Sequence, residues 1–296
     1  MARADIDALH LRLPPPSGNA WCHRGIGVDL KNIKLEVNSK QFSGSWAVIL
    51  GGSSGFGLAA VRKLAAHGMN IAMLYREMAS TEKTVKQKLG QIEKEFDAKI
   101  LAFNLNALNE EGQQTFISEF KRLVGAEKNV RLLLHSIARG NLRLLEDLTA
   151  QDMRDTTHAM GTSMLDWAKL LLKEGLFQPD ARIIGLTSEG THKYWEGYAA
   201  VSVAKAALES LARYMAVDLA PYGIRTNVIQ AGVTDTPSMK KIPGSQELLD
   251  HTVTRNPFGR MTGPADVANV IYLLCTDEAA WINGALIHVD GGEHCR

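Results

Sequence analysis

The chain has 296 residues, of which 45% are hydrophobic and 22% charged, as in an ordinary soluble globular protein. Its formal net charge of +1 gives no case for binding nucleic acid or an anionic membrane, and no apolar run reaches transmembrane length. The three cysteines, Cys22, Cys275 and Cys295, form no CxxC pair and no disulfide framework, which fits a reducing, cytoplasmic setting.

The first segment, residues 1–40, differs from the rest of the chain. It contains the proline run LPPPSGNAW and sustains neither a helical nor a strand period, and its charged start argues against a secretory signal. We expect an irregular N-terminal extension here, followed by one domain over residues 41–296.

Beyond residue 45, short apolar runs alternate with amphipathic segments. The runs predict seven strands, which read SWAVILGG, NIAMLY, AKILAFN, VRLLLHS, ARIIGLTS, IRTNVIQ and ALIHVDGG in chain order. Continuous apolar runs are expected where helices cover both faces of a parallel sheet. The alternation therefore predicts a single doubly wound α/β domain, a Rossmann domain with a seven-stranded parallel sheet.

The helical segments between these strands carry boundary signals. Gly68 stands where a glycine closes a helix, and Ser80 is placed to cap the next one. The capping box from Thr149 to Asp152 opens a long helix that we expect to reach about Glu174.

The turn after the first predicted strand reads LGGSSGFGLAA, with Gly51, Gly55 and Gly57 in the pattern G-x-x-x-G-x-G. Glycines permit a tight turn and let backbone amides approach a pyrophosphate at a helix N-terminus. Between a strand and a helix, this turn favours dinucleotide binding over a purely structural turn. The other candidate cofactor contacts in the turn are Ser53, Ser54 and Phe56.

The second predicted strand ends at Tyr75 and is followed by Arg76. NAD-binding folds usually have an acidic residue here, which binds the ribose 2′-hydroxyl. This chain presents a guanidinium that can bind a 2′-phosphate, and we expect no carboxylate that would repel one. The pattern favours NADPH, and the alternative is that Arg76 is a solvated surface residue.

The stretch YWEGYAAVSVAKAALES places Tyr198 seven residues before Lys205. Seven residues of helix make roughly two turns, so the two side chains would lie on one face. An ammonium beside a phenol would lower the phenol's pKa and let the tyrosine donate a proton near neutral pH. Alone the pair is weak support, because a Tyr and a Lys seven apart occur by chance in most proteins.

From about Phe42 to Gly292 the chain resembles the short-chain dehydrogenase/reductases. The resemblance rests on the glycine turn, the motif QAGVTDT after the sixth predicted strand, the closing VDGG, and the Tyr198/Lys205 pair. Most of that family has Tyr and Lys four apart. The seven-residue spacing, the compact glycine motif and LLHSIA in place of Asn-Asn-Ala-Gly are similar to the NADPH-dependent enoyl-acyl-carrier-protein reductases.

The resemblance implies residue roles. Tyr198 would hydrogen-bond a developing enolate oxygen, and Lys205 would hold the nicotinamide ribose. The further implied cofactor contacts are Asn104 and Leu105 near the adenine, Ser136 and Ile137 in LLHSIA, and Val233 and Thr236 at the carboxamide. Simple loop packing is the alternative for each of them.

The implied reaction is NADPH-dependent reduction of the C2=C3 bond of trans-2-enoyl thioesters carried on acyl carrier protein or coenzyme A. Charge then develops on the thioester oxygen, farther from the nicotinamide than a ketone oxygen, and three extra residues move the phenol by about 4.5 Å if helical. The alternatives are a carbonyl reductase on the same scaffold and a non-catalytic NADP(H) sensor. Retention of Tyr198 and Lys205 argues against the sensor.

Several positions depart from the family pattern. Ser188 stands where some enoyl reductases have an aromatic residue, and Leu50 replaces a usual threonine. Gly161 or Thr162 occupies the place of a helical asparagine, which puts a proton relay through it in doubt. Two adjacent aromatic residues, Tyr194 and Trp195, either line an acyl pocket or pack structurally. The histidines suggest no metal site; the nearest candidate is the C-terminal group His288, His294 and Cys295.

Assembly and motion give two further expectations. The segments SMLDWAKLLL and ALESLARYMAVDLA carry more apolar surface than one face needs, and such helices commonly pack between subunits in this superfamily, so we expect a homotetramer. The long stretch from Val233 to Gly263 contains a predicted mobile lid, from Pro237 to Phe258. In the lid, Leu248, Leu249 and Val253 have the spacing of one apolar face of a short helix. Lys240 and Lys241 either meet an acidic carrier protein or a phosphate, or stay solvated.

Overall fold

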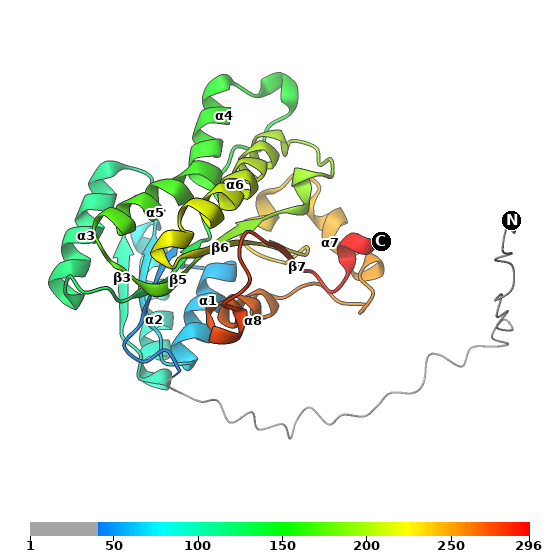
Figure 1. Cartoon of the computed structure of the whole chain (residues 1–296). Helices are drawn as coiled ribbons and strands as arrows, with labels where there is room; N and C mark the ends of the chain where they lie inside the picture. Colours follow the sequence, from blue (N-terminus) through cyan, green and yellow to red (C-terminus); the bar gives the residue numbers. More distant parts are fainter. Residues whose placement is uncertain (1–40) are drawn as a thin grey trace, which may run out of the picture. The chain divides into compact units, whose positions relative to one another are not determined.

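The computed structural model describes residues 41–296, so the predicted extension over residues 1–40 lies outside the described residues. Seven parallel strands form one sheet in the order β3-β2-β1-β4-β5-β6-β7, with helices on both faces (Figure 1). The strands are β1 (Trp46–Leu50), β2 (Asn70–Tyr75), β3 (Ile100–Asn104), β4 (Val130–His135), β5 (Phe177–Thr187), β6 (Arg225–Ala231) and β7 (Leu286–Val289). The predicted doubly wound α/β Rossmann domain is confirmed.

Eight α-helices accompany the sheet within residues 41–296. They are α1 (Gly55–Ala66), α2 (Ala79–Phe96), α3 (Glu110–Val124), α4 (Ala150–Thr157), α5 (Ser163–Lys173), α6 (Ala199–Asp218), α7 (Ser245–Arg255) and α8 (Pro264–Cys275). The first strand shows why two helical layers form. Ala47 and Ile49 pack toward α1, α2 and α8, whereas Val48 and Leu50 pack toward α3, α5 and α6, and all four are fully buried.

Helix boundaries confirm some sequence signals and correct others. Gly68 closes α1 with a φ of 83°, and Thr149 and Asp152 form the predicted capping box of α4. The expectation that Ser80 caps α2 is wrong, because the helix starts at Ala79 and Met78, two residues before Ser80, holds the cap position. Ser80 then lies inside the first turn, where it cannot act as the cap.

The long helix predicted to reach Glu174 is three pieces. A π-helical turn over His158–Thr162 joins α4 to α5, and α5 ends at Lys173. Such turns insert an extra residue into a helix and are frequent at functional sites. Apolar periodicity did not reveal this one, since the turn keeps the chain running in one overall direction.

The short helix expected between β6 and α8 is confirmed as α7. Of the predicted apolar face, Leu248 and Leu249 are buried, but Val253 is 42% exposed and Thr252 takes the buried position instead. The Thr252 hydroxyl donates to the Leu248 carbonyl at 2.7 Å, so burial leaves it no unsatisfied hydrogen-bonding group.

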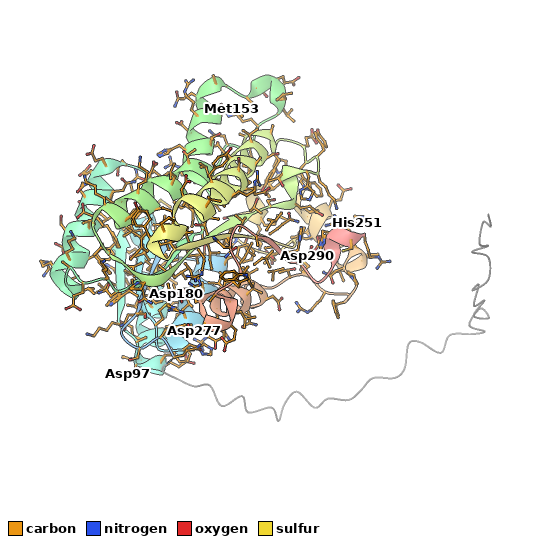
Figure 2. All side chains as sticks on the ribbon, viewed as in Figure 1. Asp97, Met153, Asp180, His251, Asp277 and Asp290 are labelled. Atoms are coloured by element: carbon orange, nitrogen blue, oxygen red, sulfur yellow. The ribbon has the colours of Figure 1, made fainter. Side chains whose placement is uncertain are left out.

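A cluster of arginines around Asp180 closes the end of the sheet where β4, β5 and β6 begin. The Arg182 and Arg225 guanidiniums both pair with Asp180, and Arg131 contacts Asp180 at 3.3 Å and Asp277 at 3.0 Å. Figure 2 labels Asp180 and Asp277 together with Asp290. Asp290 follows β7, so it lies at the opposite end of the strands. This cluster ties strand starts together and leaves the other end free for a site.

The helices of residues 41–296 include none with both the length and the apolar character needed to cross a bilayer. Cys275 is buried and Cys295 exposed, and both are free thiols. The site is therefore sought at the carboxyl ends of the strands, where open α/β sheets bind their ligands.

Candidate active site

A cavity of about 1140 Å³ opens at the carboxyl ends of the strands. It is bounded by the glycine turn after β1 and by the segments that follow β2, β4, β5 and β6. Tyr198 lines it, as do all the predicted cofactor contacts except Gly57 and Asn104: Gly51, Ser53, Ser54, Gly55, Phe56, Arg76, Leu105, Ser136, Ile137, Lys205, Val233 and Thr236. Residues widely spaced in the sequence thus meet in one cavity large enough for a ligand.

Gly57 and Asn104 do not line the cavity, but they hold the segments that do. A side chain at Gly57 would place its Cβ 2.1 Å from the Gly51 carbonyl oxygen, so only glycine lets α1 pack on its own turn. The Asn104 side chain accepts from the Glu77 amide at 3.1 Å and donates to the Glu77 carbonyl at 3.0 Å. Asn104 therefore fixes the loop after β2.

The glycine turn is held against the exit of β4. Gly51 has a φ of 88°, and a Cβ there would lie 2.6 Å from the Ser136 carbonyl oxygen. The Ser136 amide in turn donates to the Leu50 carbonyl at 2.9 Å. The conformation and the close approach both require glycine, and they leave an open cradle at the start of α1.

Arg76 lies at the cavity with an exposed side chain, and it makes no ion pair with any residue of 41–296. The expectation that no carboxylate lies here is wrong, because Glu77 also lines the cavity. The Ser53 hydroxyl donates to the Glu77 carboxylate at 2.9 Å. Sequence reasoning also missed Lys88 of α2, a second cation at this end of the cavity.

Tyr198 immediately precedes α6, in the cap position, and Lys205 lies two turns into that helix. The Tyr198 phenol donates to the Ser188 hydroxyl at 3.2 Å. Burial raises the pKa of Tyr198, and the contact with Ser188 opposes that rise. The expected lowering of the phenol's pKa by Lys205 is therefore wrong in this geometry. Gly190 leaves room for the ring, since a Cβ there would lie 2.5 Å from it.

Lys205 is buried, and its ammonium donates to the Met160 carbonyl at 3.3 Å. Burial lowers the pKa of Lys205 to about 7, against the opposing effect of Glu209. Met160 belongs to the π-helical turn, and the next residue, Gly161, would place a Cβ 2.6 Å from the Ala204 carbonyl. At Gly161, one of the two positions where the resemblance implies a helical asparagine, the π-helical turn and α6 therefore pack too closely for a side chain.

A charged group that the sequence did not reveal lies on another side of the cavity. Arg255, at the end of α7, pairs through Nη2 with Glu189 at 2.7 Å and with Glu293 at 2.6 Å. Burial raises the pKa of Glu293, and Arg255 opposes that rise. No local signal could predict this group, because its members come from distant parts of the chain.

The aromatic residues before Tyr198 have different positions. Trp195 lines the cavity, whereas the Tyr194 side chain is 88% exposed. Of the two interpretations offered for this pair, a pocket-lining role remains for Trp195 alone.

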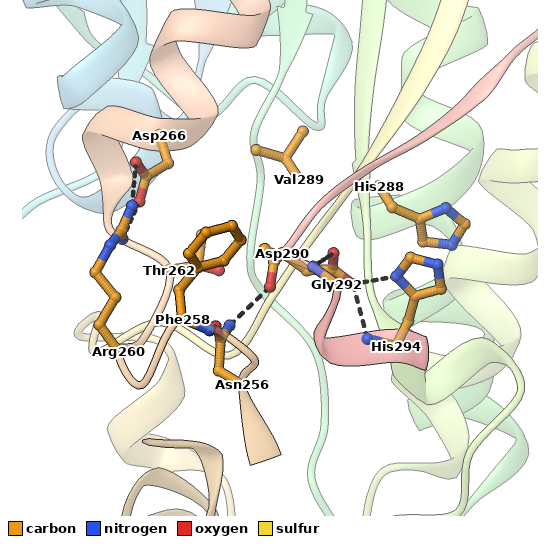
Figure 3. Close-up of a pocket in the computed structure, with 11 residues that line it drawn as sticks. Asn256, Phe258, Arg260, Thr262, Asp266, His288, Val289, Asp290, Gly292 and His294 are labelled. Carbon is orange, nitrogen blue, oxygen red and sulfur yellow. Dashed lines mark hydrogen bonds and ion pairs between the residues drawn. The ribbon is translucent and has the colours of Figure 1, made fainter. Parts of the chain in front are cut away.

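A second cavity, of about 390 Å³, lies beside the C-terminus and contains none of the predicted site residues (Figure 3). His288 and His294 stack there with ring centroids 3.9 Å apart, and His294 pairs with Asp290 at 2.6 Å. Within the part of the chain that the structure describes, no cluster suits a metal ion.

The large cavity combines a glycine cradle for phosphates, a buried lysine, and a protonated phenol that can donate a hydrogen bond. These are the parts needed to bind a dinucleotide and stabilise a developing oxyanion.

Comparisons with known proteins agree with this chemistry. A family model described as enoyl-(acyl carrier protein) reductase matches residues 51–294. The chain is 41% identical over 112 residues to the NADH-dependent enoyl-acyl-carrier-protein reductase FabI of Aquifex aeolicus, which covers 38% of this chain and 42% of that protein. It is 28% identical over 251 residues to the NADPH-dependent enoyl-acyl-carrier-protein reductase FabI of Staphylococcus aureus, covering 82% of this chain and 92% of that one.

A solved structure adds a different activity. The promiscuous reductase LugOII, which catalyses keto-reduction at C1 during lugdunomycin biosynthesis, matches with a TM-score of 0.76 and 26% identity, covering 87% of this chain and 100% of that one. Together with the fold and the cavity, the family match identifies the chain as an oxidoreductase. The chain belongs to the enoyl-(acyl carrier protein) reductase family within the short-chain dehydrogenase/reductases.

Proposed function

We propose that the chain reduces the C2=C3 double bond of trans-2-enoyl thioesters, carried on acyl carrier protein or coenzyme A, with NADPH as the reductant. The observation that carries this proposal is the seven-residue spacing of Tyr198 and Lys205, with the phenol at the start of α6 and the ammonium inside the helix, in one cavity. The family match and the two FabI relatives support enoyl reduction, and the NADPH-dependent FabI of Staphylococcus aureus is the one that supports the cofactor.

The residues present fit a dinucleotide. The turn from Gly51 to Gly57 would hold the pyrophosphate at the N-terminus of α1. Leu105, Ser136 and Ile137 would contact the adenosine half and the middle of the cofactor. Val233 and Thr236 would hold the carboxamide of its nicotinamide. Bound in this way, the cofactor supplies the hydride for C3.

Two residues would act on the substrate's oxygen and on the cofactor's position. Tyr198 keeps its proton at neutral pH because burial raises its pKa, so its hydroxyl can donate to the thioester oxygen as charge develops there. Ser188 accepts the phenol's hydrogen bond and so holds the ring ready. Lys205 would hold the nicotinamide ribose.

The preference for NADPH rests on Arg76 and Lys88. Arg76 lines the cavity from the loop after β2 and Lys88 from within α2, and the Arg76 guanidinium has no carboxylate partner within residues 41–296. Glu77 works against a 2′-phosphate, but Ser53 and Asn104 hold that segment in place. A guanidinium and an ammonium together outweigh one carboxylate in local charge.

The test follows the loss of NADPH absorbance with crotonyl-CoA and, separately, with acetoacetyl-CoA. The proposal requires turnover of crotonyl-CoA to exceed that of acetoacetyl-CoA, with Tyr198→Phe as the control for residual activity. A clear preference for acetoacetyl-CoA would show a ketone reductase instead.

That second candidate, NADPH-dependent carbonyl reduction, has its own support. The LugOII structure covers 87% of this chain, and its stated activity is keto-reduction. The Ser188 hydroxyl, hydrogen-bonded to Tyr198, would offer a second contact for a ketone oxygen. Replacing Ser188 with alanine should therefore damage ketone reduction more than enoyl reduction.

A further inference from the structure

A buried histidine on β4 has no part in the chemistry described so far. His135 is fully buried, and its Nε2 lies 2.8 Å from the hydroxyl of Ser163, the first residue of α5, which is also fully buried. These two side chains lie directly behind the π-helical turn His158–Thr162.

The hydrogen bonds fix the form of the histidine. The Ser163 hydroxyl donates to the Ala159 carbonyl at 3.1 Å, so its only hydrogen is already used. Nε2 of His135 must then donate to Ser163, which leaves Nδ1 without a hydrogen. Burial and the nearby Lys205 cation lower the pKa of His135 to about 3, so the ring is neutral at working pH.

This arrangement is costly in isolation. Nδ1 of His135 is buried and has no hydrogen-bond partner in the described part of the chain. A buried polar atom without a partner destabilises the folded state, and a buried aliphatic side chain would avoid that cost. The histidine differs from an aliphatic side chain in that its Nε2 donates a hydrogen bond to Ser163.

The π-helical turn connects this pair to the active site. Ser163 holds the carbonyl of Ala159, and the carbonyl of the adjacent Met160 accepts from the Lys205 ammonium at 3.3 Å. Gly161 packs against α6 at Ala204, one residue before Lys205. A small rotation of the turn would therefore move the acceptor that fixes Lys205.

We infer that His135 and Ser163 are positioning residues, which hold the π-helical turn so that the Met160 carbonyl receives the Lys205 ammonium and aims it at the cofactor ribose. The inference rests on the role proposed above for Lys205. The contacts run from the rigid strand β4 through Ser163 and the turn to α6. Neither positioning residue needs to touch the cofactor.

A double-mutant cycle on the dissociation constant of NADPH, measured by calorimetry, tests this. His135→Leu should weaken NADPH binding on the order of ten-fold, the value of a hydrogen bond to a charged group. Ser163→Ala should weaken it in the same direction. His135→Gln places an amide donor near the position of Nε2 and should restore most of the affinity.

Repeating the substitutions in a Lys205→Met protein separates a positioning role from a packing role. Lys205→Met should itself weaken NADPH, and in that background His135→Leu and Ser163→Ala should have no further effect. Ser118→Ala is the matched control, because Ser118 makes the same kind of bond to a carbonyl four residues earlier, on the exposed face of α3. It should leave NADPH binding unchanged.

The outcomes are distinct. Equal weakening by Ser163→Ala in both backgrounds would overturn the inference, and so would failure of His135→Gln to restore affinity. If His135→Leu does not fold, the Ser163→Ala arm alone decides, since it removes one oxygen atom. If Lys205→Met leaves NADPH binding unchanged, both the inference and the proposed role of Lys205 fall, whereas the crotonyl-CoA assay judges the reaction separately.

Discussion

Burial acts in opposite directions on the two ionisable groups proposed to form the active site. It raises the pKa of Tyr198 and lowers that of Lys205 to about 7. The phenol therefore stays protonated at neutral pH, while the lysine loses much of its preference for the charged form. A cofactor phosphate or ribose near Lys205 would favour the cation again.

Tyr198→Phe should reduce turnover of an enoyl thioester by about 100- to 1000-fold, the usual effect of losing one oxyanion donor. NADPH affinity should stay nearly unchanged, because the ring still fills the space left by Gly190. Steady-state rates and calorimetric titration of NADPH check the two halves of this prediction. Normal turnover by the variant would remove the catalytic assignment.

Arg76→Ala should weaken NADPH by about ten- to a hundred-fold and NADH much less, since only NADPH carries the 2′-phosphate that the guanidinium would bind. Glu77→Gln is the informative control and should strengthen NADPH, because it removes the carboxylate near that phosphate. Dissociation constants of both cofactors for the three proteins check this. Equal use of NADH and NADPH by the parent enzyme would contradict it.

His135 should make stability depend on pH in a defined window. Its folded pKa of about 3 lies below the ordinary 6.5, so the unfolded chain binds a proton that the folded chain refuses, and stability falls as pH drops below 6.5. Between pH 7.5 and pH 5 the loss should be about 2 kcal/mol.

The measurement is urea unfolding of the parent and of His135→Gln at the two pH values. Lys205, whose folded pKa of about 7 also lies in this range, contributes its own pH dependence to both proteins, so the difference between them reports His135. Between the two pH values the glutamine variant should lose about 2 kcal/mol less stability than the parent. An identical loss in both proteins would show that His135 is not the titrating group.

At the scale of helices and strands, the sequence predicted most where burial is continuous. The run NIAMLY corresponds residue for residue to β2, because both faces of that strand are covered and every position after Asn70 is buried. Predictions failed where distant contacts decide. The cap at Ser80, the exposed Val253 and the π-helical turn at Met160 all depend on which residues pack against them.

The segment over residues 237–258 should behave as a lid with one fixed end. Arg255 is held by Glu189 and Glu293, and the Asn256 amide donates to the Asp290 carbonyl at 2.8 Å. The other end carries the exposed Lys240, paired at 3.2 Å with Asp235, and Lys241. Closure would therefore pivot about Arg255.

Hydrogen exchange checks this prediction. Residues 237–247 should exchange fast in the free protein and slow down when NADP+ and an acyl substrate analogue are both present. Residues 251–256 should stay protected in both states, which provides the internal control. Strong, equal protection across the whole segment would show a fixed element with no lid motion.

At the scale of the whole molecule, exposed apolar side chains bear on assembly. Val203, Tyr214 and Val217 of α6 are 46%, 70% and 72% exposed, and Trp281, before β7, is 97% exposed. We expect a homotetramer that covers these faces, with a mass by light scattering of four times the 32.4 kDa chain. A monomeric mass at micromolar concentration would refute this.

A substitution sharpens the test of assembly. Val217→Glu places a charge on the outer face of α6, away from the cavity, and should lower the measured mass. Lys63→Glu, on a helix outside these faces, should leave the mass unchanged.

The sequence predicted the site better than its electrostatics. The glycine turn, Tyr198 and Lys205 are local patterns, and the fold brings them into one cavity as expected. Glu77, Arg255 and the partners of His135 carry no such pattern. Their effects come from side chains that meet only after folding, so periodicity and spacing contain no record of them.

The arginine cluster at Asp180 has a consequence for how this protein can change over generations. Three guanidiniums hold the strand starts with no help from the loops at the opposite rim. Insertions or exchanges in those loops need not loosen the frame, because the bonds that secure it lie elsewhere. A lineage could therefore acquire new substrate specificities by replacing the stretch after β6 while the ion pairs at Asp180 stay unchanged.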